Sequence, residues 1–286
     1  MKFLISGSSG LIGSSLIPSL QGEHEQVSRL VRTASVKTKQ DVLWVPAKNE
    51  IDTENLEGFD CVVHLAGESI VSRWTVAKKK RIRNSRVGAT KLLTQALSGL
   101  RAPPKTLICA SAVGYYGDRN DEILTEVSPV GTGFLAEICN EWEQATIPAV
   151  HAGIRVVYLR FPVVLSTEGG ALKKMLPPFR LGLGGFLGEG KQYMSWCTLD
   201  DVVQVIHHTI RNEEISGPIN AGTQNPVTNR VFTETLGNVL HRPIPFNLPG
   251  FMLKTALGEM AEEILLASTR THPARLLETG YKFRHA

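Results

Sequence analysis

Short continuous apolar runs alternate with amphipathic stretches along the first two thirds of the chain. A run of about four to eight apolar residues is typical of a strand buried on both faces of a parallel sheet. Apolar residues three or four positions apart are typical of a helix that packs one face against such a sheet. The pattern predicts strands near 2–6, 26–32, 61–67, 106–111, 154–160 and 217–222, and helices near 11–20, 87–97, 133–145 and 202–206.

This alternation predicts an α/β fold with a doubly wound parallel sheet and right-handed crossovers. Beyond residue 165 the composition shifts, and the segment 169–185 combines a short helix, a stop at two prolines and a glycine-rich loop of the kind that covers a site. We expect residues 1–165 to form a nucleotide-binding Rossmann domain, joined by 200–222. Residues 166–286 would form a smaller, mostly helical region on the substrate side.

Two local expectations concern the helix near 202–206. Asp200 directly precedes it and is a residue type favoured at a helix N-cap. His207 and His208 are expected to lie on the surface.

Composition and charge exclude several classes of protein. With 31 Lys and Arg against 27 Asp and Glu, the net charge of +4 is too small to indicate nucleic-acid binding. No apolar stretch approaches the ~20 residues that cross a bilayer. The chain enters a strand at once, which leaves no room for a secretory signal. The four cysteines are far apart, so neither a disulfide framework nor a metal site is expected.

We therefore expect a cytoplasmic protein that has a small-molecule substrate and binds neither nucleic acid nor membrane. A homodimer is left open.

The first strand leads into three glycines, Gly7, Gly10 and Gly13, three residues apart. In a dinucleotide-binding turn the first glycine permits the tight turn, the second lets backbone N–H groups approach a pyrophosphate, and the third lets helix and strand pack closely. The diphosphate then lies at a helix N-terminus, which favours negative charge. An ordinary strand-to-helix turn is the alternative.

Arg32 follows the second predicted strand, with no carboxylate before Asp41. An Asp or Glu at this place binds the ribose 2′-hydroxyl of NAD. A guanidinium suits a 2′-phosphate instead, because it offers bidentate, charge-assisted hydrogen bonds. We therefore predict NADP(H) as the cofactor; a solvated surface arginine is the alternative.

Small residues end the strand near 61–67, where Ala66 and Gly67 would let the cofactor lie close to the backbone. His64 within this strand is interpreted as a core histidine. Seven basic residues then fall within 73–86, and without interleaved aromatics this favours a solvated helix face over nucleic-acid binding. Arg86 first, and Arg81 second, are expected to turn toward the cofactor.

Ser111 ends the strand near 106–111 and is followed by Tyr115 and Tyr116. In an open parallel sheet, ligands bind at the carboxyl ends of strands near the point where the strand order reverses. Ser111 is therefore placed to hydrogen-bond a substrate carbonyl or hydroxyl, and the two tyrosines follow within reach.

Further motifs lie at 64–68, at Trp74 with 84–86, and at 114–117, 175–185 and 225–229. Together with the glycine turn they resemble the 39U-type epimerase group of the extended short-chain dehydrogenase/reductase superfamily, over nearly the whole chain. The resemblance implies an NADP(H)-binding Rossmann fold. The cofactor residues that it implies are Gly7, Gly10, Leu11, Ile12, Gly13, Arg32, Leu65, Ala66, Gly67, Arg86 and Val164.

The chain departs from this group in two places. Residues 196–201 read Trp-Cys-Thr-Leu-Asp-Asp where the group has Trp-Ile-His-Ile-Asp-Asp, so any role of that histidine is absent. Relatives are also expected to continue beyond Phe283 with a terminal helix, which would make this chain short at its C-terminal end.

The superfamily's proton transfer uses a Tyr-x-x-x-Lys pair, in which the lysine and the cofactor lower the pKa of the tyrosine from ~10. None of the five tyrosines has a lysine four residues on. Alignment on Glu143 puts Leu135 and Cys139 at the two positions. A proton donor must come from elsewhere, and the candidates in falling order are Tyr115, Tyr116, Ser111 and Tyr193.

Two functions therefore remain open. One is an NADP(H)-dependent oxidoreductase or epimerase acting on a small substrate held by Ser111 near Tyr115 and Tyr116. The other is a non-catalytic NADP(H)-binding protein that senses redox state or regulates a partner.

Overall fold

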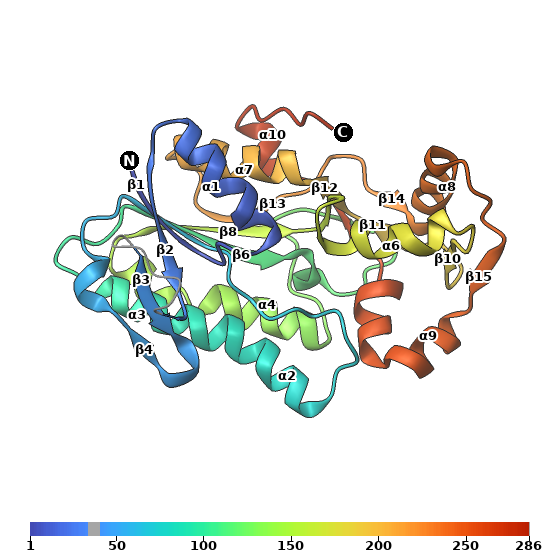
Figure 1. Ribbon diagram of the computed structural model, residues 1–286, viewed down its shortest axis with the longest axis horizontal. Helices are drawn as coiled ribbons and strands as arrows, with labels where there is room; N and C mark the ends of the chain where they lie inside the picture. The colour runs from blue at the N-terminus through green and yellow to red at the C-terminus, as the bar shows by residue number, and fades with distance from the viewer. Residues whose placement is uncertain (34–40, 286) are drawn as a thin grey trace.

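The computed structural model describes residues 1–33 and 41–285, and its centre is one large sheet (Figure 1). Among the described residues this sheet has eight strands in the order β13-β8-β6-β5-β1-β2-β3-β4. Their bounds are β1 Lys2–Ser6, β2 Gln26–Val31, β3 Val42–Val45, β4 Glu50–Ile51, β5 Cys61–His64, β6 Thr106–Ala112, β8 Arg155–Phe161 and β13 Gly217–Asn220.

The sheet is doubly wound, as predicted. Its strands pair in parallel except for β4, which runs antiparallel to β3. From β1 the chain goes to β2 on one side, and β5 then returns to the other side of β1. The strand order therefore reverses between β1 and β5, which is where an open α/β sheet binds its ligand.

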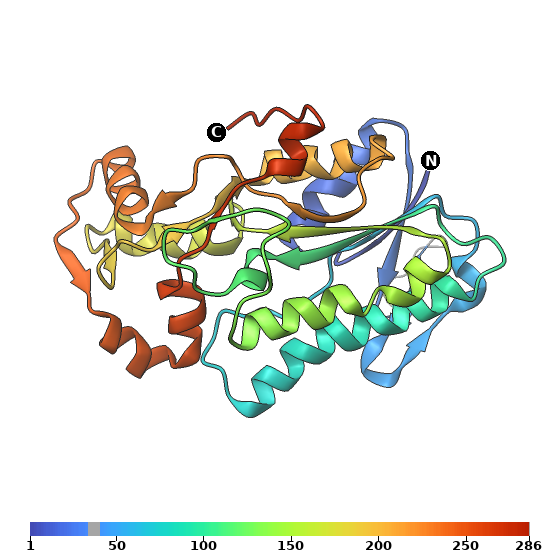
Figure 2. The same cartoon turned by 180° about the vertical axis from the view of Figure 1, so that it is seen from behind.

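Helices cover both faces of the sheet (Figures 1 and 2). Phe3 and Ile5 of β1 pack with Leu16 in one core cluster, whereas Leu4 packs with Leu93 in the other, because successive strand residues point to opposite faces. The first cluster lies under α1 Leu11–Gly22, α7 Leu199–Arg211 and α10 Ala274–Glu278. The second lies under α3 Ala89–Ser98 and α5 Ile147–His151, beside α2 Val76–Arg83 and α4 Phe134–Gln144.

The basic stretch 73–86 forms α2 and most of the π-helical segment η4, Asn84–Gly88, which continues into α3. The expectation of a solvated face is wrong in part. Lys78 is buried, and its Nζ lies 2.7 Å from a carboxylate oxygen of Glu68. Ion pairs with carboxylates across the fold thus neutralise part of the basic run, a feature that the local pattern does not contain.

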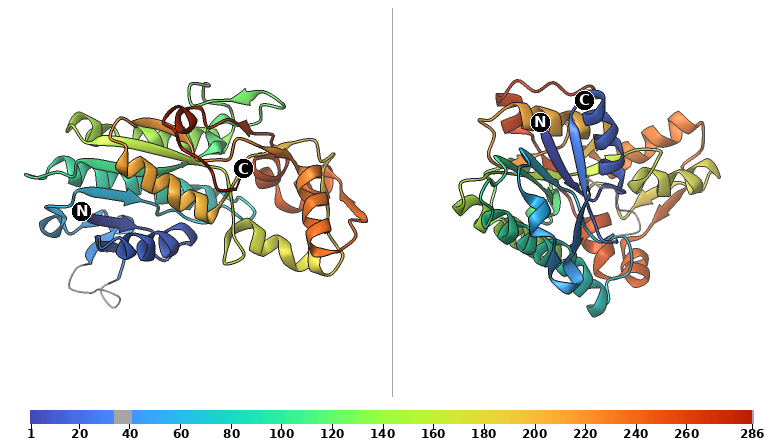
Figure 3. Two further views of the ribbon diagram at one scale, coloured as in Figure 1. Left: turned by 90° about the horizontal axis from the view of Figure 1, so that it is seen from above. Right: turned by 60° about the vertical axis from the view of Figure 1, so that its left-hand side comes forward.

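A smaller lobe lies at one end of the sheet (Figure 3). It is built from α6 Gly170–Arg180, α8 Asn229–Leu240, α9 Gly250–Leu257, the π-helical η6 Ala261–Leu266, and the parallel pair β10 Gly185–Leu187 and β15 Phe246–Leu248. Short pairs connect it to the sheet: β9 Val163–Leu165 with β12 Trp196–Thr198, β11 Tyr193–Met194 with β14 Val227–Thr228, and β7 Ile123–Leu124 with β16 Arg270–Thr271.

The two prolines do not stop α6, contrary to expectation. Pro177 and Pro178 lie inside the helix, which ends at Arg180. A proline's φ already suits a helix. Inside a helix a proline is unfavourable because it lacks the N–H that would donate a hydrogen bond and because its ring clashes with the preceding turn. Because both prolines lie close to the helix end, the final turn still closes, with the amide of Leu181 donating to the Pro177 carbonyl at 3.2 Å.

The end of the described chain returns to the large sheet. Leu276 and Tyr281 are buried in the same core cluster as Phe3. Asp201, fully buried, accepts hydrogen bonds from the backbone amides of Arg284 at 2.8 Å and His285 at 3.1 Å. Residues beyond 270 thus pack with the sheet, and the domain boundary at residue 165 stays a prediction.

The start of α7 corrects two local expectations. Its N-cap is Thr198, whose hydroxyl accepts from the amide of Asp201, and Asp200 is already inside the helix. His207 is 3% exposed, and its Nε2 lies 2.9 Å from the hydroxyl of Ser19, because α1 packs against this face of α7. Among the described residues, no helix is both long and apolar enough to cross a membrane.

Candidate functional site

The glycine turn between β1 and α1 has the geometry that its spacing predicts. Gly7 has φ +68°, and a Cβ there would lie 2.8 Å from the carbonyl carbon of Leu65. A Cβ on Gly13 would overlap the carbonyl oxygen of Gly7. The first glycine therefore permits both the turn and its approach to β5, and the third allows α1 to pack against the turn.

The start of α1 is open to an anion. Gly10 is its N-cap, no side-chain hydrogen bond caps it, and its first turn contains no acidic residue. The helices α2 and α8, in contrast, are each capped by a threonine hydroxyl, from Thr75 and Thr228. Uncapped N–H groups at a helix start suit a phosphate, so these residues fit the diphosphate of a dinucleotide.

Leu11 and Val164 lie at the same edge of this turn. A Cβ built on Gly170, at the start of α6, would lie 3.1 Å from Leu11 Cδ2 and 3.4 Å from the Val164 carbonyl oxygen. Ile12 instead packs against the core cluster of β1. The structure therefore brings Val164 to the glycine turn and Leu11, from which it is far apart in the sequence.

The end of β5 lies against the turn as well. Ser6 Oγ accepts from the amides of Leu65 at 3.1 Å and Ala66 at 3.3 Å, and it lies 2.7 Å from His64 Nδ1. His64 is fully buried, and burial lowers its pKa to about 4. The interpretation of His64 as a core histidine is confirmed. Its neutral imidazole is hydrogen-bonded through both ring nitrogens and so supports the strand ends.

Arg86, rather than Arg81, is the basic side chain at Gly67. A Cβ on Gly67 would lie 3.3 Å from Arg86 Cζ, and Arg86 Nη1 donates to the Glu68 carbonyl at 3.0 Å. The side chain of Arg81 is 60% exposed, and its Nε lies 3.7 Å from a carboxylate oxygen of Glu68. Of the two arginines expected to turn toward the cofactor, the structure brings Arg86 to the end of β5.

Arg32 is exposed just beyond the end of β2, the strand that pairs with β1. This is the place in the sheet where the sequence analysis expects the 2′-phosphate.

Two of the three predicted catalytic residues belong to a buried polar network. Ser111, 3% exposed, donates to Glu143 Oε1 at 2.7 Å. Arg160, 2% exposed, binds both carboxylate oxygens of Glu143 at 2.8 Å. Tyr116 is fully buried, and its hydroxyl donates to Asn220 at 2.7 Å and accepts from Arg160 at 2.9 Å.

This network corrects the expected role of Tyr116. Burial is the main reason that its pKa is raised to about 12, and both hydrogen-bonding functions of its hydroxyl are used inside the protein. Tyr116 is therefore a structural residue in this fold. Ser111 is held in its present rotamer by Glu143, so it does not present a free hydroxyl.

Tyr115 has a different environment. It is partly buried, its ring stacks on Arg160 with Cζ 3.6 Å from the ring centroid, and its hydroxyl has no hydrogen bond to the described residues. Tyr193 is partly buried, and its ring lies 4.6 Å from Arg270 Cζ. Among the predicted donors from 111–116, Tyr115 is the one whose hydroxyl is uncommitted within the described chain.

Leu135 and Cys139 of α4 face the end of β6. A Cβ on Gly114 would lie 3.3 Å from Leu135 Cβ and 3.9 Å from Cys139 Sγ. These are the two positions where the resemblance places the tyrosine and lysine of the superfamily pair. Burial raises the pKa of the Cys139 thiol to about 12, so this thiol does not act as an acid or base at neutral pH.

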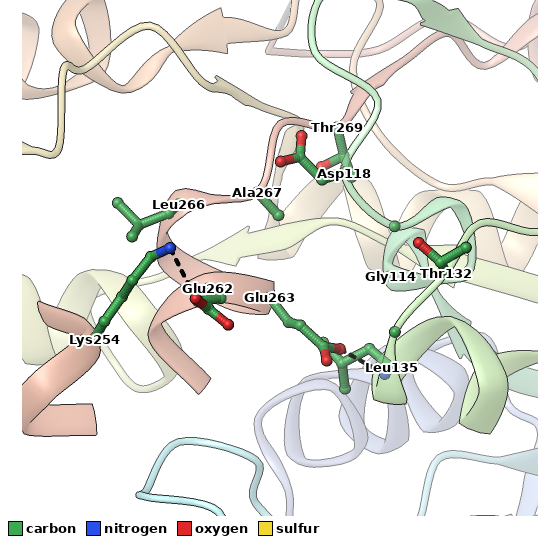
Figure 4. A pocket seen from close by; sticks show the side chains of 12 residues that line it. Gly114, Asp118, Thr132, Leu135, Lys254, Glu262, Glu263, Leu266, Ala267 and Thr269 are labelled. Atoms are coloured by element: carbon green, nitrogen blue, oxygen red, sulfur yellow. Dashed lines mark hydrogen bonds and ion pairs between the residues drawn. The ribbon is translucent and has the colours of Figure 1, made fainter. Parts of the chain in front are cut away.

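A cavity of about 360 Å³ lies between the segment after β6, the start of α4 and the α9–η6 region (Figure 4). Gly114 and Gly117 line one wall, and Leu135 lies at the start of α4. The polar side chains that line it are Asp118, Thr132, Lys254, Glu262, Glu263 and Thr269. The size suits a small molecule.

Glu263 connects the smaller lobe to α4. Its carboxylate accepts from the backbone amides of Phe134 at 2.9 Å and Leu135 at 2.8 Å, so it caps the N-terminus of α4 (Figure 4). Glu262, beside it, lies 2.8 Å from Lys254. The wall opposite β6 is therefore held in place by an acidic side chain from η6.

Arg160 and Glu263 were not predicted from the sequence, and Glu143 served only to align the Tyr-x-x-x-Lys positions. Arg160 carried a signal, because a charge at the end of an apolar strand implies a buried partner. Glu263 carried none, since its partner amides lie 128 and 129 residues away in the chain.

The chain matches two protein-family models. The NAD dependent epimerase/dehydratase family matches residues 3–222, and a domain of unknown function, DUF1731, matches residues 248–286. The second match covers α9 and η6 and so includes the wall of the cavity that carries Glu263.

Several proteins and solved structures are similar over nearly the whole chain. An epimerase family protein of Mycobacterium bovis is 44% identical over 98% of this chain and 93% of its own length, and a chloroplastic SDR39U1 homologue of Arabidopsis thaliana is 35% identical over 100% and 84%. The human epimerase family protein SDR39U1, solved with NADPH, has a TM-score of 0.90 at 30% identity and covers 100% and 95%.

A nucleoside-diphosphate sugar epimerase structure from Corynebacterium glutamicum has a TM-score of 0.82 at 38% identity. That match covers the whole of this chain and 56% of the other. A UDP-glucose 4-epimerase of Thermotoga maritima shares the fold, with a TM-score of 0.76 at 16% identity.

Proposed function

Because the chain belongs to the NAD dependent epimerase/dehydratase family, we propose that it is an NADP(H)-dependent oxidoreductase or epimerase. Its substrate would be a small molecule held in the cavity beyond β6. The observation that carries this proposal is the uncapped start of α1 at the glycine turn, which lies where the strand order reverses. A polar cavity lies beyond β6, at the same edge of the sheet.

NADP(H) binds at the glycine turn and supplies a hydride acceptor or donor at its nicotinamide. Gly7, Gly10 and Gly13 let the backbone approach the diphosphate, while Leu65–Gly67 and Val164 border the turn. Arg32 binds the 2′-phosphate. The human relative solved with NADPH, similar over the whole chain, supports this choice of cofactor.

The residues around the cavity orient the substrate and move its proton. Tyr115 is the preferred donor, because it lies between the cavity-lining Gly114 and Gly117 in the chain and its hydroxyl is uncommitted. Ser111 is a less favoured proton donor, because the Ser111 hydroxyl must first break its hydrogen bond to Glu143. The carboxylates of Asp118 and Glu262 with the Lys254 ammonium make this cavity polar, so it suits a substrate rich in hydroxyl or carbonyl groups.

The sequence left open a non-catalytic NADP(H)-binding regulator. Neither the family membership nor the polar cavity favours this alternative, and the experiment below separates it from an enzyme. A cytoplasmic location remains a proposal supported by the four buried free thiols, as does the absence of nucleic-acid binding. A homodimer stays a prediction.

The test follows a label from cofactor to substrate without a guess at the substrate. The protein is incubated with NADPH deuterated at nicotinamide C4 and a small-molecule extract of cells, and mass spectrometry then searches for a metabolite that gains deuterium. We expect one that depends on the wild-type protein and is lost in Ala267→Trp, which fills the cavity while the protein still binds NADPH.

Tight NADPH binding with all label retained on the nicotinamide, for either deuterated face, would overturn hydride transfer from NADPH to a metabolite. A second incubation with NADP⁺ and deuterated water then tests the epimerase, and no deuterium in any metabolite there would leave the regulator. Absence of NADPH binding would instead overturn the cofactor assignment itself.

A further inference from the structure

We propose that Arg86 replaces the lysine of the missing Tyr-x-x-x-Lys pair and supplies from η4 the cation that the superfamily supplies from α4. The guanidinium would bind the cofactor at the end of β5, beside Gly67 and over the face of α4 that carries Cys139. This inference rests on the proposed function, because it concerns the same cofactor.

The first support is the position of the guanidinium. Arg86 Cζ lies next to Gly67 and 5.2 Å from the ring centroid of Trp142. Trp142 follows Cys139 by three residues on α4, so the two side chains share one face of the helix. The cation therefore covers the surface of α4 from which a lysine at position 139 would extend.

The second support is the electrostatic coupling between Arg86 and that position. Burial and the charge of Glu143 raise the pKa of Cys139, and the charge of Arg86 acts in the opposite direction on the same thiol. Burial also lowers the pKa of Arg86 itself. A positive charge is thus already present beside residue 139, although the side chain at 139 is neutral.

The third support is that Arg86 makes no hydrogen bond or ion pair with a carboxylate of the described residues, although the charge of Glu68 acts on it. Other basic residues of the same stretch reach carboxylates: Lys78 pairs with Glu68, Lys79 with Glu259 and Arg83 with Glu141. Arg86 contacts Glu68 through the backbone carbonyl, and its Nε and Nη2 donate to none of the described residues.

Arg86 is partly buried, and the donors that the described residues leave free remain open to a ligand. Carboxylate and phosphate oxygens are the partners that a guanidinium binds best. The free donors of Arg86 therefore indicate a ligand rich in such oxygens, which a dinucleotide is.

The fourth support is the backbone that carries Arg86. Residues Asn84–Gly88 form a π-helical turn between α2 and α3. Such turns are rare, and they are frequent at functional sites because the helix there is locally widened. The unusual turn and the unpaired cation occur at the same residue.

The experiment measures binding of NADPH and NADH by fluorescence titration. Arg86→Met should weaken both cofactors at least tenfold and to the same degree, since Arg86 is remote from the 2′-phosphate site. The matched control Lys80→Met, which removes an exposed cation of the same stretch, should change the two dissociation constants less than twofold.

A rescue variant tests the replacement itself. In Arg86→Met, the further change Cys139→Lys places an ammonium where the superfamily has its lysine, in space that the guanidinium has left. We expect this double variant to bind both cofactors at least threefold more tightly than Arg86→Met does. Cys139→Lys alone should gain nothing, because Arg86 already provides the charge.

Unchanged cofactor binding in a folded Arg86→Met protein would overturn the proposal, and so would a folded double variant without rescue. If Arg86→Met does not fold, Arg86→Lys carries the test. It keeps the charge, so it should bind both cofactors within about threefold of the wild-type affinity; a loss of tenfold or more would overturn the proposal. If the wild-type protein binds neither cofactor, the proposed function itself is overturned.

Discussion

At the residue scale, the buried ion pair of Arg160 and Glu143 decides which hydroxyls are available for chemistry. Burial opposes the charge of Arg160, but the hydrogen bonds and the charge of Glu143 outweigh it, so the pKa of the guanidinium is raised. The pair also holds Ser111 and Tyr116. Removing one partner of such a pair typically costs about 3–5 kcal/mol, so these two hydroxyls belong to the stability of the fold.

We expect Arg32 to control the choice between NADPH and NADH. Arg32→Asp should weaken NADPH binding by about 1.5–3 kcal/mol, roughly 10- to 150-fold in Kd, because a charge-assisted hydrogen bond to the 2′-phosphate is lost. NADH binding should change little. Calorimetric titration of both cofactors checks this, and equal losses would show that Arg32 does not contact the 2′-phosphate.

At the scale of elements, α4 is completed by a residue from another lobe. Its N-cap, Gly133, has no side chain to offer, and Glu263 of η6 supplies the carboxylate instead. A carboxylate at a helix start satisfies N–H groups and interacts favourably with the helix dipole. The arrangement fixes η6 relative to β6 and so sets the width of the cavity.

Glu263→Ala should therefore destabilise the protein by about 1–2 kcal/mol, the usual cost of a lost N-cap. Glu262→Ala removes the adjacent, half-exposed carboxylate and should cost less than about 1 kcal/mol, as for a surface ion pair. Urea unfolding of both variants gives the comparison. Equal losses would argue against the cap, and faster amide exchange at Phe134 and Leu135 in Glu263→Ala would support it.

At the scale of the whole molecule, one segment closes the cavity and anchors the C-terminal end. The amide of Ser268 donates to Asp118 at 3.1 Å beside the cavity, and β16 then pairs with β7. Farther on, Leu276 and Tyr281 enter the main core, where Asp201 binds the backbone of Arg284. The smaller lobe is thus held to the sheet on both sides of the cavity wall.

Asp201→Ala should release residues 281–285 from the sheet. A buried acceptor that bonds several amides is worth about 1–3 kcal/mol, and its loss should expose this segment to carboxypeptidase and to amide exchange. Asp200→Ala, one residue earlier and exposed, is the matched control and should cost less than about 1 kcal/mol. Equal protection of the segment in both variants would contradict the anchoring role.

The sequence by itself determined the sheet, the glycine turn and the neutral core role of His64. Apolar runs report burial, and glycine spacing reports the backbone angles of a few adjacent residues, so both are local properties. Tertiary structure decided the rest: that the buried Tyr116 hydroxyl bonds Asn220, that Glu263 caps α4, and that Arg86 lies over Trp142. These contacts join residues tens to more than a hundred positions apart, and strand order and helix packing bring them together.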